Sequence, residues 1–271
     1  MQNKATKVIM LKYVIKHPFA LFHFIFELNR MRLNSKYSFK ESENTNSFSN
    51  FEDLLNFMFP LGYSNKGSGL TLVELLRIYD EGIQKIRELY GEKLYSILSF
   101  DEAVILYFSI LLQKPEIVVE SGVSDGMSSL FILNALKSNG TGRLYSIDFP
   151  DVGMPIIYGK EPGWIVPEHM RTQWDLILGK SKNKLPILLE RLKFIDIFIH
   201  DSEHSYQNMK FEFNCALQHS HEDSIIMSDD VAANHAFMEC LQLSSMEFKV
   251  GTLNNSESDF AIAILRKKSI S

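Results

Sequence analysis

The distribution of apolar positions changes at Pro115. Beyond it, short continuous apolar runs alternate with segments whose apolar residues have helical spacing. The runs occupy 117–121, 143–148, 174–178, 194–200 and 224–230, and the helical segments lie near 126–138, 184–192, 205–219 and 233–243. Continuous runs are expected of strands that are buried on both faces of a sheet. Strand–helix alternation of this kind predicts a doubly wound, parallel α/β fold.

The end of the chain breaks the alternation. Residues 246–253 and 259–267 form two further strand patterns with only a short link between them. Such a link permits an antiparallel hairpin but not a parallel crossover. The pattern therefore predicts a mostly parallel, seven-stranded, Rossmann-like sheet that ends in an antiparallel hairpin.

The first 100 residues have a different texture. The stretch 41–50 is polar and rich in turn formers, which predicts a linker. Helical patterns follow near 51–59 and 71–96, and Ser99 with Glu102 has the spacing of a capping box that opens a helix. We therefore expect a helical N-terminal extension over 1–100 and a catalytic α/β domain over 101–271.

Charge is unevenly placed along the chain. Residues 1–40 hold eight basic residues and one acidic residue, a net charge of +7, which leaves −12 for the remainder of a chain whose net charge is −5. An acidic catalytic body argues against a nucleic-acid substrate, because phosphate binding needs a basic surface. The two cysteines have neither metal-ligand spacing nor a disulfide framework, as expected in a reducing cytoplasm.

The apolar stretch 8–28 is interrupted by basic residues and by Pro18, and it lacks a small-residue cleavage site. It therefore has the pattern of neither a secretory signal nor a spanning helix. A basic, Phe-rich segment of this kind could lie on a membrane surface, which would give peripheral membrane contact through residues 1–40. Alternatively it packs on the catalytic domain or on a second subunit, and a homodimer is the default expectation.

The sequence VVESGVSDGMSS, residues 118–129, carries the first candidate chemistry. A strand leads into Glu120 and Gly122, and a helix follows Gly126. Gly122 permits close approach of a ligand at the carboxyl end of a strand, where open α/β sheets bind ligands. The ExGxxxG spacing is wider than the glycine cradle of dinucleotide folds, so it favours an amino acid with a sulfonium over a pyrophosphate. Asp148 ends the next strand, where an acid commonly accepts hydrogen bonds from ribose hydroxyls.

Acids gather at the ends of two later strands. HDSEHSY, residues 200–206, contains Asp201, and SDDVAAN, residues 228–234, contains Asp229 and Asp230. Three carboxylates at one sheet edge repel unless a cation neutralises them or their pKa values rise. Oxygen ligands of this kind suit Mg²⁺. Glu203 and His204 are candidate general bases beside such a metal.

From about Pro115 to Phe237 the chain resembles the methyltransferase 24 type of class I methyltransferases, a metal-dependent O-methyltransferase-like group. The resemblance rests on ESGVSDG, on Trp164-x-Val-Pro with the following WDLILGKS, on FIDIFIHDSEHSY and on SDDVAANHAF. It implies an S-adenosylmethionine pocket and a divalent metal site. The implied cofactor-binding residues are Glu120, Gly122, Ser124, Gly126, Asp148, Ser181 and Asp201, and the implied metal ligands are Asp201, Asp229 and Asp230.

One departure from the family pattern concerns residues 179–181. Gly-Lys-Ser stands there instead of Gly-Asp-Ser, and the missing acid leaves open how the adenine end is held. The aromatic-rich stretch 150–175, with Tyr158, Trp164 and Trp174, is expected to wall the acceptor pocket.

The predicted function is S-adenosylmethionine-dependent, metal-assisted O-methylation of a small molecule or sugar hydroxyl. One alternative is an S-adenosylmethionine-binding enzyme of other chemistry, such as a hydroxylase, since a fold does not fix a function. A second is a membrane-surface or scaffold protein whose catalytic domain has degenerated.

Overall fold

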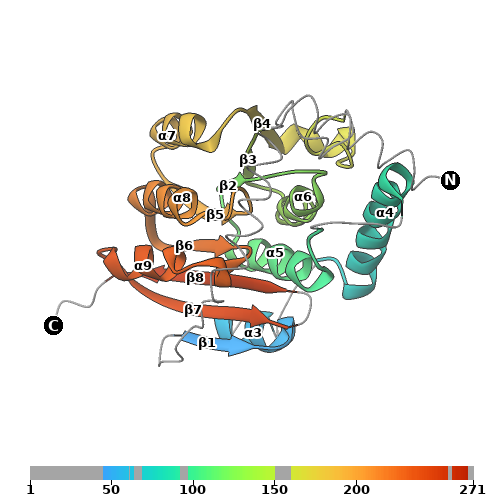
Figure 1. Ribbon diagram of the computed structural model, residues 1–271. Coiled ribbons are helices and arrows are strands. Elements are labelled where there is room, and N and C mark those ends of the chain that lie inside the picture. Colours follow the sequence, from blue (N-terminus) through green and yellow to red (C-terminus); the bar gives the residue numbers. More distant parts are fainter. Residues whose placement is uncertain are drawn as a thin grey trace.

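The computed structural model describes residues 45–60, 62–63, 69–91, 97–149, 160–255 and 258–267. Its centre is an eight-stranded sheet with the order β1-β7-β8-β6-β5-β2-β3-β4 (Figure 1). The strands are β1 (Thr45–Phe48), β2 (Ile117–Ser121), β3 (Arg143–Asp148), β4 (Trp174–Leu178), β5 (Ile195–His200), β6 (Ser220–Ser228), β7 (Glu247–Asn254) and β8 (Asp259–Arg266). Strands β2 to β6 are mutually parallel, whereas β8 runs antiparallel to both β6 and β7. The predicted fold class is confirmed.

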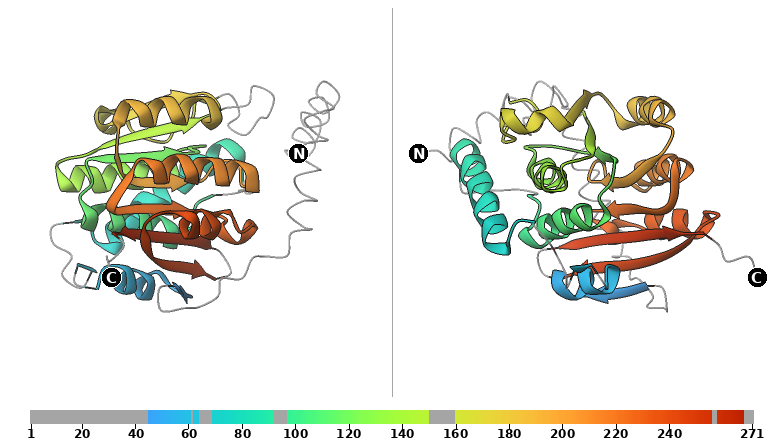
Figure 2. Two further views of the ribbon diagram at one scale, coloured as in Figure 1. Left: turned by 90° about the vertical axis from the view of Figure 1, so that its left-hand side faces the viewer. Right: turned by 180° about the vertical axis from the view of Figure 1, so that it is seen from behind.

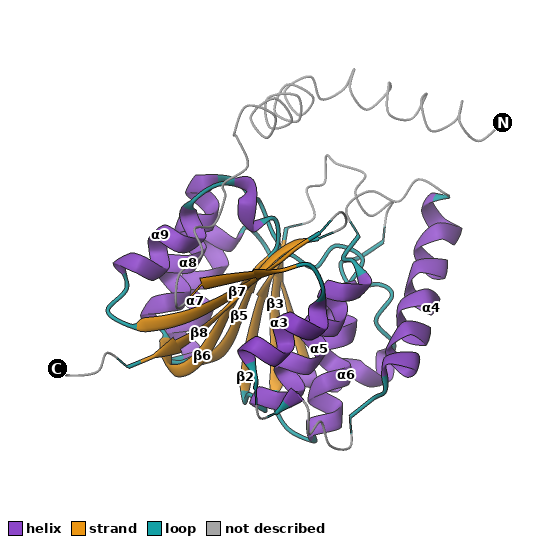
Figure 3. Ribbon diagram, turned by 90° about the horizontal axis from the view of Figure 1, so that it is seen from below, coloured by secondary structure: helices purple, strands orange, loops and turns teal. Residues whose placement is uncertain are grey.

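Helices cover both faces of the sheet (Figure 3). The α-helices are α3 (Phe51–Met58), α4 (Leu72–Tyr90), α5 (Phe100–Gln113), α6 (Met127–Asn139), α7 (Ser181–Leu192), α8 (Tyr206–Gln218) and α9 (Ala236–Leu243), with 3-10 turns η3 (Glu168–Gln173) and η4 (Val231–Ala233). Helices α3 to α6 share one buried apolar cluster with the sheet, and α7 to α9 share the other. The sheet is therefore buried on both faces, as the continuous apolar runs predicted.

The sheet has one strand more than the sequence predicted. Residues 45–48 were expected within a linker, but they form β1, which pairs in parallel with β7 from Thr45↔Val250 to Phe48↔Leu253. The linker prediction is wrong for these residues. A four-residue, mostly polar run has no strand periodicity of its own, and it becomes a strand because β7 offers an open edge of backbone hydrogen-bonding groups.

The predicted start of α5 is confirmed by its cap. Ser99 accepts from the Glu102 backbone N–H at 3.2 Å, and Glu102 accepts in return from the Ser99 N–H at 2.8 Å. Such reciprocal bonds satisfy N–H groups that would otherwise lack a partner in the first turn. The cap holds the Glu102 carboxylate in a buried position.

The N-terminal extension is described only from residue 45. Its helix α4 stands against the first turn of α6 (Figures 1 and 2). A Cβ atom on Gly82 would lie 2.7 Å from Met127 Cε, so the two helices are in close contact. No helix in the described part of the chain is long and apolar enough to cross a membrane. The membrane and dimer contacts proposed for residues 1–40 lie outside the described residues, and the domain division at residue 100 stays a prediction.

Candidate functional site

The turn after β2, the glycine turn (residues 122–126), brings two backbone segments into unusually close contact. Gly122, Ser124 and Gly126 all have positive φ angles, at 92°, 50° and 101°. A Cβ atom built on Gly122 would lie 1.9 Å from the carbonyl oxygen of Asp201, far inside any allowed contact. Glycine is therefore required at 122 both by conformation and by space. The turn exposes Ser124 at the carboxyl edge of the sheet, where a ligand would meet it.

Asp148 is connected directly to this turn. One of its carboxylate oxygens, Oδ2, accepts from the backbone N–H groups of Val123 and Ser124, each at 2.8 Å. Burial raises the pKa of Asp148, while these two bonds act in the opposite direction. A contact between Asp148 and ligand hydroxyls, the role predicted for this acid, stays a prediction.

Glu120 has a fully buried carboxylate. It accepts hydrogen bonds from the hydroxyls of Ser128 at 2.5 Å, Ser129 at 2.6 Å and Ser146 at 2.6 Å. Burial raises its pKa, and the three hydroxyls oppose that shift. The carboxylate thus connects β2 to the first turn of α6 and to β3, and it stabilises the two elements that flank the glycine turn. A direct contact between Glu120 and a cofactor stays a prediction.

Ser181 begins α7, which follows β4, and β4 lies two strands from β2 in the sheet. Its hydroxyl lies 3.4 Å from Asn208 Oδ1 of α8, and the preceding Gly179 donates its N–H to the Asp148 carbonyl at 2.8 Å. The Gly-Lys-Ser segment therefore lies beside Asp148, on the predicted adenine side. Its contact with a cofactor also stays a prediction.

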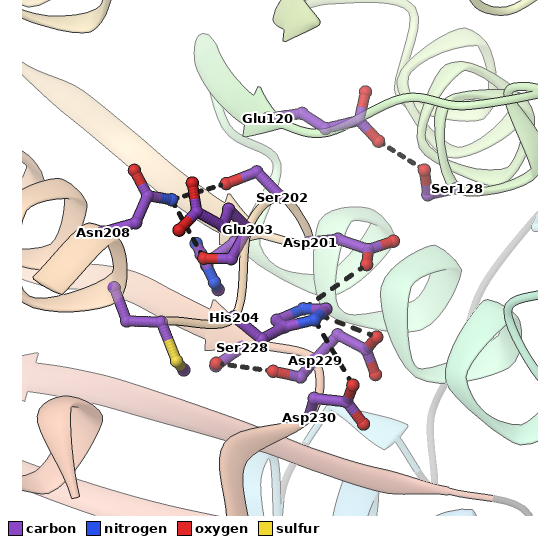
Figure 4. Close-up of polar contacts among 12 residues, drawn as sticks. Glu120, Ser128, Asp201, Ser202, Glu203, His204, Asn208, Ser228, Asp229 and Asp230 are labelled. Carbon is purple, nitrogen blue, oxygen red and sulfur yellow. Dashed lines mark hydrogen bonds and ion pairs between the residues drawn. The ribbon is translucent and has the colours of Figure 1, made fainter. Parts of the chain in front are cut away.

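The structure brings four of the predicted residues together at the ends of β5 and β6. Figure 4 shows the His204 ring between the carboxylates of Asp201 and Asp229. His204 Nε2 lies 3.8 Å from Asp201 Oδ1 and 3.9 Å from Asp229 Oδ2. The second ring nitrogen, Nδ1, lies 3.3 Å from Asp230 Oδ2. Asp201, His204 and Asp229 each offer a ligand atom within 4.8 Å of the others.

The raised pKa values of the carboxyl groups in this cluster indicate that a cation would stabilise their ionised forms. Burial and the neighbouring Asp229 raise the pKa of Asp201 well above its ordinary value. Burial, Glu102 and Asp230 raise the pKa of Asp229 to about 7. Burial and the adjacent His200 lower the pKa of His204 to about 3, so its imidazole is neutral at pH 7.

The donor set fits a divalent metal. His204 Nε2 is buried and has no hydrogen-bond partner among the described residues, and it faces the two carboxylates. The two carboxylates are acceptable ligands for a divalent cation of the Mg²⁺ or Mn²⁺ type, and the neutral imidazole nitrogen faces the same position. Asp230 is not one of this trio, and its carboxylate contacts the ring at Nδ1. Its place as a metal ligand stays a prediction.

Glu203, the other candidate base, is exposed. Its backbone carbonyl accepts from Asn208 Nδ2 at 3.0 Å, and its side chain lies on the Asn208 side of the loop (Figure 4). Within the described residues, the Glu203 carboxylate therefore does not join Asp201 and Asp229. Of the two candidates, only His204 lies inside the cluster.

Sequence reasoning missed two contributors to the site. Glu102 was read only as a cap, yet its buried carboxylate raises the pKa of Asp229. His200 and Glu212 form a fully buried pair beneath the loop, with Nδ1 2.7 Å from Oε2. The only available signal was their polarity within an apolar strand and an otherwise amphipathic helix.

The expectation for the aromatic stretch is wrong in one place. Trp174 is buried in the core, and its indole N–H donates to the Ser146 hydroxyl at 2.8 Å, so it does not wall a pocket. The core position arises because β4 places this side chain under the loop that carries Gly163. Trp164 contacts the glycine turn instead, and Tyr158 lies outside the described residues.

Comparison with known proteins gives a family and a fold. Residues 119–231 match the family model of a methyltransferase domain. No match was found among curated proteins. The matched family is the methyltransferase 24 type that the motifs predicted, so the resemblance is confirmed for residues 119–231.

Several solved structures share the fold. The O-methyltransferase TomG from Streptomyces achromogenes, solved with S-adenosylmethionine, is 17% identical with a TM-score of 0.54, over 70% of this chain and 89% of that one. An O-methyltransferase from Bacillus cereus, solved with S-adenosylhomocysteine, is 16% identical with a TM-score of 0.54, over 80% and 98%. The methyltransferase PaMTH1 of Podospora anserina is 12% identical with a TM-score of 0.51, over 86% and 99%. At these identities the likeness establishes the fold.

Proposed function

We propose that this chain transfers the methyl group of S-adenosylmethionine to an oxygen atom of a small molecule or sugar. The premise is that residues 119–231 form a methyltransferase domain. The observation that supports oxygen as the methyl acceptor is that the glycine turn lies next to the Asp201–His204–Asp229 cluster. The Asp201 carbonyl lies against Gly122, so the donor turn and the acidic cluster share one loop contact. A donor held at the turn would therefore sit beside groups suited to activate a hydroxyl.

The residues divide the work between donor and acceptor. The turn 122–126 and Asp148 would bind the donor, with Asp148 accepting from the ribose hydroxyls. Asp201 and Asp229, with Asp230 nearby, would hold a divalent cation. That cation would lower the pKa of a hydroxyl placed next to it. Holding the nucleophile, methyl carbon and sulfur in line would supply much of the rate enhancement.

His204 is the residue that we assign as proton acceptor. Its Nδ1 faces Asp230 at 3.3 Å, which leaves Nε2 as the nitrogen that can accept a proton. Nε2 points toward Asp201 and Asp229, where an acceptor hydroxyl would be held. After proton transfer, the Asp230 carboxylate would stabilise the imidazolium.

The proposed function is tested by measuring product formation. Purified protein would be incubated with S-adenosylmethionine and a panel of phenols, catechols and sugars, with Mg²⁺ or with EDTA. We expect S-adenosylhomocysteine to accumulate with at least one hydroxylated acceptor and to fall in EDTA. Calorimetry with S-adenosylhomocysteine alone provides a test that needs no acceptor. Absence of binding together with absence of turnover would overturn the proposal.

Replacing His204 with asparagine separates the base from a metal ligand. As a base, His204 contributes about 10²- to 10⁴-fold, so kcat should fall by that order while Mg²⁺ affinity stays within about threefold. Glu203→Gln provides the comparison at the neighbouring position, because its exposed carboxylate lies outside the cluster. A large loss of Mg²⁺ affinity in His204→Asn would instead make His204 a ligand.

A further inference from the structure

Asp125, in the middle of the glycine turn, is held by two aromatic donors from distant parts of the chain. The Tyr90 hydroxyl, at the end of α4, donates to Asp125 Oδ1 at 2.8 Å. The Trp164 indole N–H donates to the same oxygen at 2.5 Å. These residues are separated from Asp125 by 35 and 39 positions in the sequence. The turn is therefore connected to the N-terminal extension and to the segment that follows β3.

Backbone contacts reinforce the same connection. Gly163 donates its N–H to the Ser124 carbonyl at 2.8 Å, and Ile165 donates to the Asp125 carbonyl at 3.2 Å. A Cβ atom on Gly126 would lie 2.6 Å from Gly163 Cα, so the two loops touch without an intervening side chain. The turn is thus packed directly against the segment that carries Gly163 and Ile165.

The turn needs such external support. Gly122, Ser124 and Gly126 are all held at positive φ, and Ser124 is not a glycine. Backbone in this region persists only where its surroundings determine it. Asp148 holds the turn through the N–H groups of Val123 and Ser124, and Asp125 is the opposite anchor.

We propose that Tyr90 and Trp164 are positioning residues for the methyl donor, acting through Asp125 to hold the turn in its binding conformation. The inference rests on the proposed function, because it assigns the donor to this turn. It gives helix α4 of the extension a role in cofactor affinity. This helix lies outside residues 119–231, which the family model matches.

The test is calorimetry of the full-length chain with S-adenosylhomocysteine. Tyr90→Phe and Trp164→Phe should each weaken binding about tenfold, the order expected from losing a hydrogen bond to a charged group. The double variant should lose less than the product of the two, because both donors serve one oxygen. Tyr79→Phe is the matched control on the same helix, since its hydroxyl donates to the Leu98 carbonyl and not to the turn. Its melting temperature should fall while its affinity stays within about twofold of wild type.

A second pair of variants keeps the test decisive if the aromatic variants fold poorly. Asp125→Asn retains an oxygen acceptor and should bind more tightly than Asp125→Ala. Wild-type affinity in Tyr90→Phe and Trp164→Phe, or equal affinity in the two Asp125 variants, would overturn the inference alone. A wild-type chain that binds no S-adenosylhomocysteine would overturn the proposed function itself, and this inference with it.

Discussion

Replacing Asp229 with asparagine is expected to reduce Mg²⁺ affinity by about 100-fold or more, because even residues that only support metal ligands contribute 10- to 100-fold. Asp229 supplies one of the two carboxylates that face His204 Nε2, and asparagine keeps the volume while removing the charge. Methyl transfer should fall in parallel, and S-adenosylhomocysteine affinity should change little. Calorimetric titration with MgCl₂ measures the first effect and S-adenosylhomocysteine titration the last.

Asp223→Asn is the matched control for this variant. Asp223 lies within β6 (Ser220–Ser228), whereas Asp229 directly follows the end of that strand. Its positive φ of 69° is well tolerated by asparagine, so the substitution removes one carboxylate at no conformational cost. Equal loss of Mg²⁺ affinity in the two variants would mean that general negative charge, and not the cluster, attracts the cation.

The metal-free Asp229→Asn protein should also be more stable than wild type at alkaline pH. The pKa of Asp229 is raised to about 7 in the fold, so the folded chain disfavours its ionised form. A raised carboxyl pKa costs stability as pH rises from the unfolded value, near 4, through the folded value. Melting temperatures in EDTA should therefore agree at pH 4 and diverge in favour of the variant at pH 8. A variant that melts below wild type at pH 8 would contradict the raised pKa that burial, Glu102 and Asp230 give to Asp229.

The parallel strands, the terminal hairpin and the carboxyl-edge location of the site were predictable from the sequence because they follow from local rules. Continuous apolar runs identified the parallel strands, and the short link before Asp259 identified the hairpin. Parallel strands carry their carboxyl ends to one edge, so acids that follow β5 and β6 had to meet there. The Asp201, Asp229 and Asp148 positions follow directly from that geometry.

What the sequence did not predict depends on contacts between distant segments. Strand β1 exists because β7 has an edge to pair with, and TNSF alone carries no strand signal. Trp174 looks like an exposed pocket aromatic until β4 places it in the core against Ser146. The bond from Tyr90 to Asp125 joins residues of two regions that composition separates into different units. Each of these depends on tertiary packing, which no local pattern encodes.

Replacing Gly122 with alanine should abolish measurable S-adenosylhomocysteine binding, a loss of about 100-fold or more if the donor turn is displaced, since geometric errors near 1 Å cost this much. The new methyl group would lie 1.9 Å from the Asp201 carbonyl oxygen and 2.9 Å from the Ser202 nitrogen. Relief requires the loop that carries Asp201 to move away from the turn, so donor site and metal site should both be damaged. Titrations with S-adenosylhomocysteine and with MgCl₂ measure the two losses.

Gly140→Ala separates this clash from simple backbone strain. Gly140 also has a positive φ, 70°, but a Cβ atom there would meet nothing within 4 Å. In both variants an alanine must adopt a positive φ, which lowers the free energy of unfolding by about 1–2 kcal/mol. Urea denaturation measures this loss. Only Gly122→Ala adds the collision with Asp201, so only that variant should lose ligand and metal affinity. If the two variants bound S-adenosylhomocysteine equally well, the contact between Gly122 and Asp201 would have no part in forming the donor site, and the coupling between turn and metal cluster would have to be abandoned.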